Sequence, residues 1–313
     1  MDSLNRLALE LVDEAIDFAD TLNVGVVDLD CGATVLDFGV EQAGGIEAGL
    51  LLSEIQTAGL ATVSSRLGEV AGAPIPEIEL TTDHPAIALL GSQKAGWEVS
   101  VDGYEALGSG PARALVGEEE EFVQLGYHDA FEFAVLALEA GELPTDAIAE
   151  HVAALADVEP ESVFLPTVPT ASVAGSVTVA ARAAELALFR LLELGYDPLD
   201  VLSATASAPV APVAASEQEA IGRTNDALAY GGRVHLAVRE ESDVFAELPS
   251  TAADEYGRPF TEVFADADWT FSEVPESVFA PAQVTVDVVG GPTTVHGERD
   301  EELLEASFEL RCG

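Results

Sequence analysis

Lysine is almost absent from this chain of 313 residues: its 12 basic residues are eleven arginines and one lysine, Lys94. Against them stand 57 aspartates and glutamates, spread along the whole chain, for a formal net charge of −45. Such self-repulsion strains a compact state at low ionic strength but is screened in concentrated salt, where the Debye length falls to about 3 Å at 1 M. We therefore expect a cytoplasmic protein from a salt-adapted organism. The alternative, an acidic protein that binds cations or basic partners, explains the missing lysines less well, and we expect no nucleic-acid partner.

Cysteine and patterned histidine are also scarce. Cys31 and Cys312 lie near opposite ends of the chain, which excludes a disulfide framework and a zinc knuckle. The five histidines show no HxH or HxxxH spacing, so we expect no metal site. No apolar stretch reaches the roughly 18 residues of a membrane span. The acidic first twenty residues lack the basic segment of a signal peptide, and we expect none.

The composition is that of a folded protein, because 48% of the residues are hydrophobic and only 22% are charged. Helical spacing of apolar residues predicts an amphipathic helix over 3–22, with Asn23 as its cap. Alternating residues predict β-hairpins over 24–39 and 283–298. These patterns indicate an α+β fold, layered in the α/β manner, with two domains. We place the domains at 1–166 and 167–313, with segments free to exchange between them.

The remaining elements follow from the same patterns. Further strands are expected near 60–66, 75–80, 97–101, 162–167 and 233–238, further helices over 44–52, 129–140, 144–156, 172–194, 215–229 and 300–309, and loops over 166–172 and 203–216.

Two glycine-containing turns could bind a ligand. In GSQKAGW (91–97), glycines bracket a turn that places Lys94 on a loop beside a buried strand. A chance surface lysine is the alternative, but a chain that otherwise avoids lysine favours a functional role. In LGSGPARAL (107–115), the turn runs into a helix start and offers amide donors and Arg113 to an anion or a polar ring. A tight loop that needs glycine for its backbone explains this stretch equally well.

The apolar stretch over 172–195 contains one isolated pair of charges, Arg182 and Glu185, three residues apart and hence on one helix face. A helix this apolar is buried, so the two charges must pair or face a cavity that holds a ligand. In the first case they form an internal salt bridge. In the second, Glu185 is a general base and Arg182 orients water or a substrate oxygen.

GRTNDALAYGGR (222–233) places Asn225 and Asp226 side by side just before an expected helix end and a glycine turn. An amide beside a carboxylate matches the donor and acceptor edge of a heterocycle such as a pterin. A plain turn is the alternative and is favoured from the residues alone.

Taken together, these stretches resemble the methenyltetrahydromethanopterin cyclohydrolases, archaeal enzymes of one-carbon metabolism. The resemblance runs from the first helix to about residue 240, and beyond that point it supports only the fold. Several long motifs in the same order make it specific. They are CGATVLDFGV, HPAIALLGSQKAGW, GSGPARAL, PTASVAGS followed by Arg182 and Glu185, and GRTNDALAYGGR.

The resemblance implies hydrolysis of the N5,N10-methenyl group of a reduced pterin carrier to the N5-formyl form. The reaction is reversible and needs no metal or redox cofactor. The resemblance also implies a homotrimer with the carrier held in a pocket between the two domains. It makes Glu185 the catalytic base and Arg182 the residue that positions water, and it places Gln93, Lys94 and Ala95 against the reacting carbon. The full substrate-binding set is then expected to be Gln93, Lys94, Ala95, Ser109, Arg113, Thr170, Asn225 and Asp226.

Three alternatives remain open at this stage. Tetrahydrofolate could replace tetrahydromethanopterin, since both carry a pterin and an arylamine nitrogen. A small-metabolite phosphotransferase could use the Gly-Ser-Gly turn, although the turn lacks the GKS/T ending of a P-loop. A trimer that binds a pterin without catalysis would show no change in any measurable activity when Glu185 is replaced by glutamine.

Overall fold

The computed structural model describes residues 2–270 and 273–311. The chain forms two compact units, unit 1 (Met1–Thr62 and Ala86–Thr178) and unit 2 (Val63–Pro85 and Val179–Gly313). Each unit contains its own sheet with helices, so the expected α+β class is confirmed. The boundaries of these units differ from the expected division at 166/167 in two ways. The transition follows Thr178, and the segment 63–85 packs with the second half of the chain.

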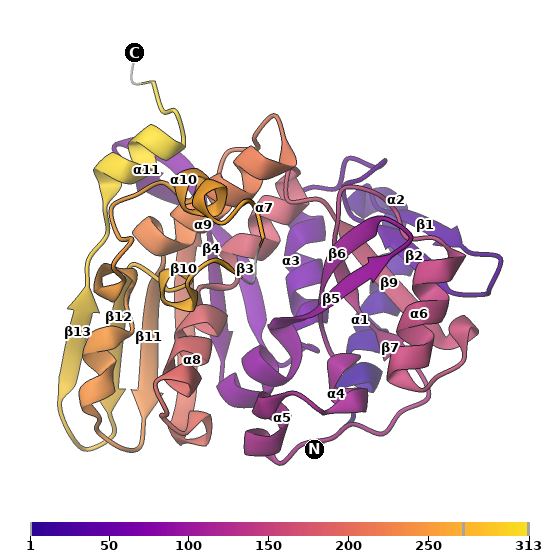
Figure 1. The fold of residues 1–313 in the computed structure, drawn as a ribbon, viewed down its shortest axis with the longest axis horizontal. Helices are drawn as coiled ribbons and strands as arrows, with labels where there is room; N and C mark the ends of the chain where they lie inside the picture. The colour runs from indigo at the N-terminus through magenta and orange to yellow at the C-terminus, as the bar shows by residue number, and fades with distance from the viewer. Residues whose placement is uncertain (1, 271–272, 312–313) are drawn as a thin grey trace. The chain divides into compact units, whose positions relative to one another are not determined.

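Unit 1 is built on a mixed sheet of order β1-β2-β9-β8-β6-β5, in which β7 also pairs with β9 (Figure 1). Its strands are β1 Gly25–Asp28, β2 Thr34–Asp37, β5 Ala95–Val101, β6 Tyr104–Ser109, β7 Ala134–Val135, β8 Ala137–Glu139 and β9 Val163–Val168. Its helices are α1 Leu4–Asp17, α2 Ala19–Leu22, α3 Ile46–Gln56, the π-helix η1 Ala86–Gln93, α4 Arg113–Val116, α5 Glu120–Leu125, α6 Asp146–Ala156, the short 3-10 helix η2 Pro160–Ser162 and α7 Val173–Ala180.

The central strands of the unit 1 sheet are buried on both faces. The neighbouring strand residues Val35 and Leu36 belong to different hydrophobic clusters, as adjacent residues must when both faces of a strand are covered. Leu36 packs in a cluster that includes Leu4 of α1 and Leu52 of α3. Val35 packs in another that includes Val152 of α6. Apolar residues therefore form the middle of these strands, such as Val35 and Leu36 of β2.

Unit 2 contains a six-stranded sheet of order β13-β12-β11-β10-β4-β3 (Figure 1). Its strands are β3 Thr62–Val70, β4 Ala73–Thr82, β10 Val201–Pro209, β11 Arg233–Val238, β12 Gln283–Val288 and β13 Thr293–Gly297. Its helices are α8 Ala183–Glu193, α9 Glu217–Gly231, α10 Phe260–Asp266 and α11 Glu301–Ser307, with short 3-10 helices η3 Pro198–Asp200, η4 Asp243–Glu247, η5 Ser250–Ala252 and η7 Glu276–Val278.

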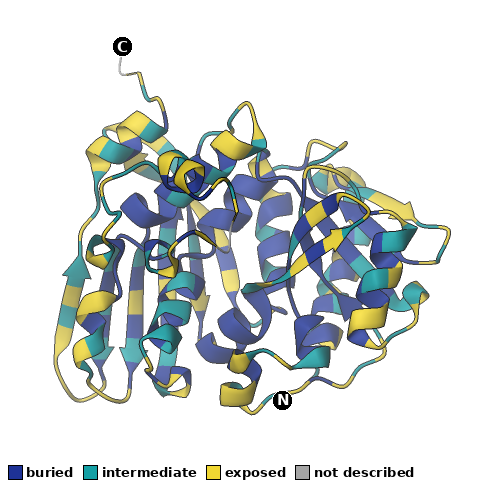
Figure 2. Ribbon diagram, viewed as in Figure 1, coloured by how far each residue is buried: buried dark blue, intermediate teal, exposed yellow. Residues whose placement is uncertain are grey.

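The sheet of unit 2 is packed on one face only. Buried and more exposed residues alternate along β11 and β12 (Figure 2), as in a sheet with one face on the core and the other toward solvent. Helices α8 and α9 both contact β10. Helices α9, α10 and α11 share a separate cluster rich in aromatic residues, which includes Tyr230, Phe260 and Phe308.

Both predicted hairpins are confirmed. β1 pairs antiparallel with β2 across the turn at Gly32, and β12 pairs antiparallel with β13 across Gly290 and Gly291. The predicted first helix exists but is divided at Phe18, and Asn23 ends it in the left-handed conformation.

Three secondary-structure predictions were wrong. Residues 129–140 form β7 and β8 instead of a helix, because a strand buried on both faces reads as a continuous apolar run that periodicity cannot separate from a helix. Residues 201–209 form β10, whereas we expected a loop from 203 onward. The expected helix 172–194 is two helices, α7 and α8, and α7 contains glycine, serine and β-branched residues of modest helix propensity.

Candidate functional site

The Arg182–Glu185 pair lies where α8 begins. Arg182 is the N-cap residue, and Glu185 is in the first turn. Arg182 Nη1 donates a hydrogen bond of 3.2 Å to Glu185 Oε2, and the two residues are 8% and 4% exposed. The predicted long helix is divided just before this pair, between α7 and α8. The spacing of three residues still brings the two side chains together. The start of a helix also favours a carboxylate electrostatically.

This geometry limits what the pair can do. A neighbouring guanidinium favours the ionised form of a carboxylate, whereas burial disfavours it. An ionised carboxylate within a mostly apolar helix can accept a proton from a water molecule, which is the task of a general base. The neighbouring residues Ala183, Ala184 and Leu188 are fully buried, so the pair is the polar feature of an otherwise apolar helix start.

The predicted turn around Lys94 is much shorter than expected. The π-helix η1 ends at Gln93 and β5 begins at Ala95, so Lys94 is the single residue between them. The amide of Lys94 donates to the carbonyl of Leu89, five residues earlier, which is the hydrogen-bond pattern of a π-helix. Short π-helical segments occur frequently at functional sites. Ser109 lies directly opposite Ala95 in the β5–β6 ladder, so this predicted site residue joins the turn.

The ammonium of Lys94 meets carboxylates of the segment that follows α4. Its Nζ forms an ion pair with Glu121 and lies 4.0 Å from Glu119 Oε2. Burial raises the pKa of Glu121, but the hydrogen bond and the positive charge of Lys94 outweigh burial, and the pKa lies below its ordinary value. Both glutamates belong to a run of four at 118–121, which our reading of the sequence did not single out. That run, close after a glycine turn, was the available signal.

Arg113 is surrounded by protein groups. It is fully buried, and its Nε and Nη2 bind the carboxylate of Glu119 at 3.0 and 2.5 Å. Its Nη1 donates to the carbonyls of Leu90, Ser92 and Lys94. Protein groups therefore occupy the donors that we expected Arg113 to offer to an anion or a polar ring.

A second set of buried polar groups connects α3 to the same turn. Ser92 Oγ donates to the backbone carbonyl of Gln56 at 2.6 Å, and Gln56 Nε2 donates to Ser109 Oγ at 3.0 Å. All three residues are at most 3% exposed. The sequence reading missed Gln56, because nothing local distinguishes a glutamine at a helix end. Thr170, also buried, donates its hydroxyl hydrogen to Glu139 at the end of β8.

Asn225 and Asp226 lie within α9 instead of in a turn before its end. Asn225 Nδ2 donates to the carbonyl of Ile221 in the same helix. Asp226 is buried, and its oxygens accept hydrogen bonds from the amide of Phe260 at 2.8 Å and the hydroxyl of Ser307 at 2.6 Å. Burial raises the pKa of Asp226 to about 6 although these bonds oppose the rise. Contacts within unit 2 thus account for this carboxylate without a ligand.

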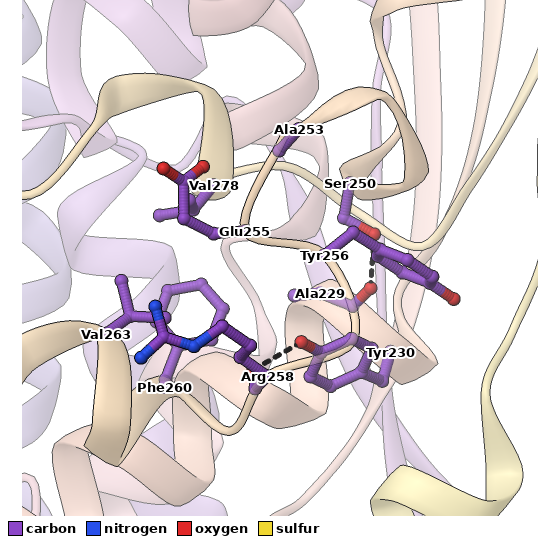
Figure 3. Close-up of a pocket in the computed structure, with 10 residues that line it drawn as sticks. All are labelled: Ala229, Tyr230, Ser250, Ala253, Glu255, Tyr256, Arg258, Phe260, Val263 and Val278. Carbon is purple, nitrogen blue, oxygen red and sulfur yellow. Dashed lines mark hydrogen bonds between the residues drawn. The ribbon is translucent and has the colours of Figure 1, made fainter.

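Unit 2 also contains a small hollow beside α9 and α10 (Figure 3). Its volume is about 220 Å³ even when space open to solvent is included, whereas pockets for small molecules usually measure about 300–1,000 Å³. The hydroxyl of Tyr230 points to the carbonyl of Arg258 and donates to it at 2.5 Å. None of the predicted site residues lines this hollow.

Comparisons with known proteins identify the family of the chain. A family model described as "Cyclohydrolase (MCH)" matches residues 3–308. The chain belongs to the methenyltetrahydromethanopterin cyclohydrolase family. Relatives with that name include a protein of Halobacterium salinarum, 62% identical over 99% of this chain and 100% of its own length. Others come from Methanothermobacter marburgensis and Methanosphaerula palustris, 41% and 40% identical over 99% of this chain and 100% of their own lengths.

The match to the cyclohydrolase family covers more of the chain than the motifs of the sequence did. Those motifs end near residue 240, whereas the family model matches up to residue 308. The high identity to a Halobacterium cyclohydrolase fits the salt adaptation expected from the net charge. Within the described residues, no helix has both the length and the apolar character that a membrane crossing requires.

Proposed function

We propose that this protein hydrolyses the N5,N10-methenyl group of tetrahydromethanopterin to the N5-formyl group, reversibly, with Glu185 as general base. The observation that supports the base most directly is the buried Arg182–Glu185 pair at the start of α8. It occurs in a chain whose full-length relatives are named for this reaction.

The chemistry needs little beyond a base and an ordered substrate. The methenyl carbon belongs to an amidinium-like cation and is already electrophilic, so attack by water requires no Lewis acid or redox cofactor. As water attacks, one of its protons passes to Glu185, and a neutral tetrahedral carbinolamine forms. The bond from carbon to N10 then breaks, N10 takes the proton from the Glu185 carboxyl, and the hydroxyl loses its proton to solvent to become the formyl oxygen. Arg182 keeps Glu185 ionised between turnovers and orients the water.

Most of the remaining predicted residues bind the substrate in this proposal. Gln93 and Ala95 hold the developing formyl oxygen, since preorganised groups around a developing charge stabilise a transition state. Lys94 gives its charge to the carboxylates beside it and so shapes the turn. Ser109, Thr170 and Asn225 complete the set.

The decisive variant is Glu185→Gln, with loss of the methenyl chromophore measured in molar KCl on both tetrahydromethanopterin and tetrahydrofolate substrates. Loss of a general base lowers kcat by about 10²- to 10⁴-fold, and we expect a fall in that range. Glu193→Gln is the matched control, because Arg190 and Glu193 form a pair of the same three-residue spacing on the same helix. We expect it to leave kcat within about twofold.

Equal rates for the wild type and Glu185→Gln on both carriers would overturn the assignment of the base. A wild type that acts on neither carrier would overturn the activity itself. Preference for the folate substrate would replace the carrier and leave the mechanism standing. We also propose a cytoplasmic homotrimer, in line with the family resemblance. Sedimentation in molar KCl tests the oligomeric state, since a monomer or dimer would refute it.

A further inference from the structure

We propose that Glu119 and Glu121 are positioning residues for the reaction, which act through Arg113 and Lys94 on the turn at Gln93. This inference rests on the proposed function of that turn in substrate binding. Neither glutamate needs to touch substrate for this role.

The first step of the argument is the end of the π-helix. A helix leaves its last carbonyls without partners in the helix, and buried carbonyls need donors from elsewhere. The carbonyl of Lys94 accepts from Arg113 Nη1 at 2.8 Å, and the carbonyls of Leu90 and Ser92 lie at 3.3 and 3.4 Å from the same nitrogen. One guanidinium nitrogen thus contacts carbonyls on both sides of Gln93.

The second step is the charge of this guanidinium. A fully buried arginine is tolerated only if a carboxylate pairs with it in good geometry. Glu119 supplies this partner through two parallel bonds, the arrangement that best fixes the plane of a guanidinium. The side chain of Phe122 adds a ring whose centroid is 5.4 Å from the guanidinium carbon. Glu119 therefore determines where Arg113 directs its donors.

The third step is the single lysine. Its ammonium pairs with the buried Glu121 and lies near Glu119, so two cations and two carboxylates form a neutral group. Lys94 is also the only residue between η1 and β5, so a contact that holds its side chain constrains the backbone of the turn. The only lysine of the chain thus lies where its ammonium connects Glu119 and Glu121 to the end of the π-helix.

The fourth step is an independent steric observation at Gly96. A Cβ atom at this position would lie 2.3 Å from Glu119 Oε2 and 2.5 Å from Arg113 Nε. The first residues of β5 therefore lie directly against the Arg113–Glu119 pair. Gly96→Ala should displace the pair without removing any charge.

The experiment compares Glu119→Gln and Glu121→Gln with Glu118→Gln and Glu120→Gln. The two control residues belong to the same run of four glutamates but are exposed, and each variant removes one negative charge. Displacement of a positioned group by about 1 Å costs on the order of 10²-fold in rate. We expect kcat to fall about 10- to 100-fold in the test pair, with a smaller change in KM, and to stay within twofold in the controls. Gly96→Ala should resemble the test pair.

A second readout does not depend on activity. Because Lys94 is the only lysine, growth on ¹³C-labelled lysine gives a single Cε resonance. We expect this resonance to shift in Glu119→Gln and Glu121→Gln and to stay in place in both controls. An unchanged resonance in Glu121→Gln would refute the contact. A shifted resonance with unchanged kcat would refute the positioning role. If the resonance shifts in both test variants but the wild type has no activity, the proposed function and this role fail together, although the contact stands.

Discussion

Replacement of Asp226 by asparagine should stabilise unit 2 at neutral pH, although it removes a buried carboxylate that accepts two hydrogen bonds. Asp226 is only 2% exposed, and burial raises its pKa from 3.8 to about 6. The folded protein therefore binds this proton more tightly than the unfolded chain does. Its favourable effect on stability is complete below pH about 4 and is lost as the pH rises to about 6.

The magnitude follows from the pKa. One pKa unit corresponds to about 1.4 kcal/mol, so a rise from 3.8 to about 6 costs the folded state about 3 kcal/mol at pH 7. An asparagine carries no charge, and its oxygen can still accept from the amide of Phe260 while its Nδ2 donates to the hydroxyl of Ser307. We therefore expect Asp226→Asn to be more stable than the wild type by up to about 3 kcal/mol at pH 7 and nearly equal to it at pH 4.

The assay is equilibrium unfolding by urea in molar KCl at several pH values between 4 and 7. The difference between variant and wild type isolates Asp226 from the other acids. Asp254→Asn removes an exposed carboxylate of the same unit and controls for the loss of one charge. A variant less stable than the wild type at pH 7 would refute the reasoning. A tenfold rise in KM would instead place Asp226 in substrate binding.

Two further predictions concern single residues of each unit. Burial and the neighbouring Glu276 raise the pKa of Glu193 to about 7, so its contribution to stability is lost as the pH rises from about 4.5 to 7; Glu193→Gln should reduce the pH dependence of Tm in that range, and an unchanged profile would refute the cause. In unit 1, a Cβ at Gly175 would lie 2.1 Å from the carbonyl oxygen of Pro169. Alanine normally gains up to about 1 kcal/mol over glycine within a helix. Overpacking costs about 1–3 kcal/mol, so Gly175→Ala should lower the urea midpoint of unit 1, and a raised midpoint would contradict this.

Local patterns predicted much of the fold because the physics behind them is local. Both hairpins depend on alternating residues around a glycine turn, and the Arg182–Glu185 contact depends on a spacing of three residues. That spacing survived even though the helix is divided, since Arg182 caps α8 and Glu185 is in its first turn. β10 was missed although its signal was present. Ala204, Ala206 and Ala208 alternate with polar residues, but small side chains look like a loop when nothing shows that a sheet covers them.

The sequence by itself determined the acidic, lysine-poor composition, the α+β class, the hairpins and the candidate base with its arginine. Tertiary structure alone decided that 63–85 pairs with the second half of the chain, that an apolar run after residue 129 forms strands, and that Arg113 pairs with Glu119. These features depend on partners distant in the sequence. The burial of a side chain and the partners of its hydrogen-bond donors depend on groups that only folding brings close to it.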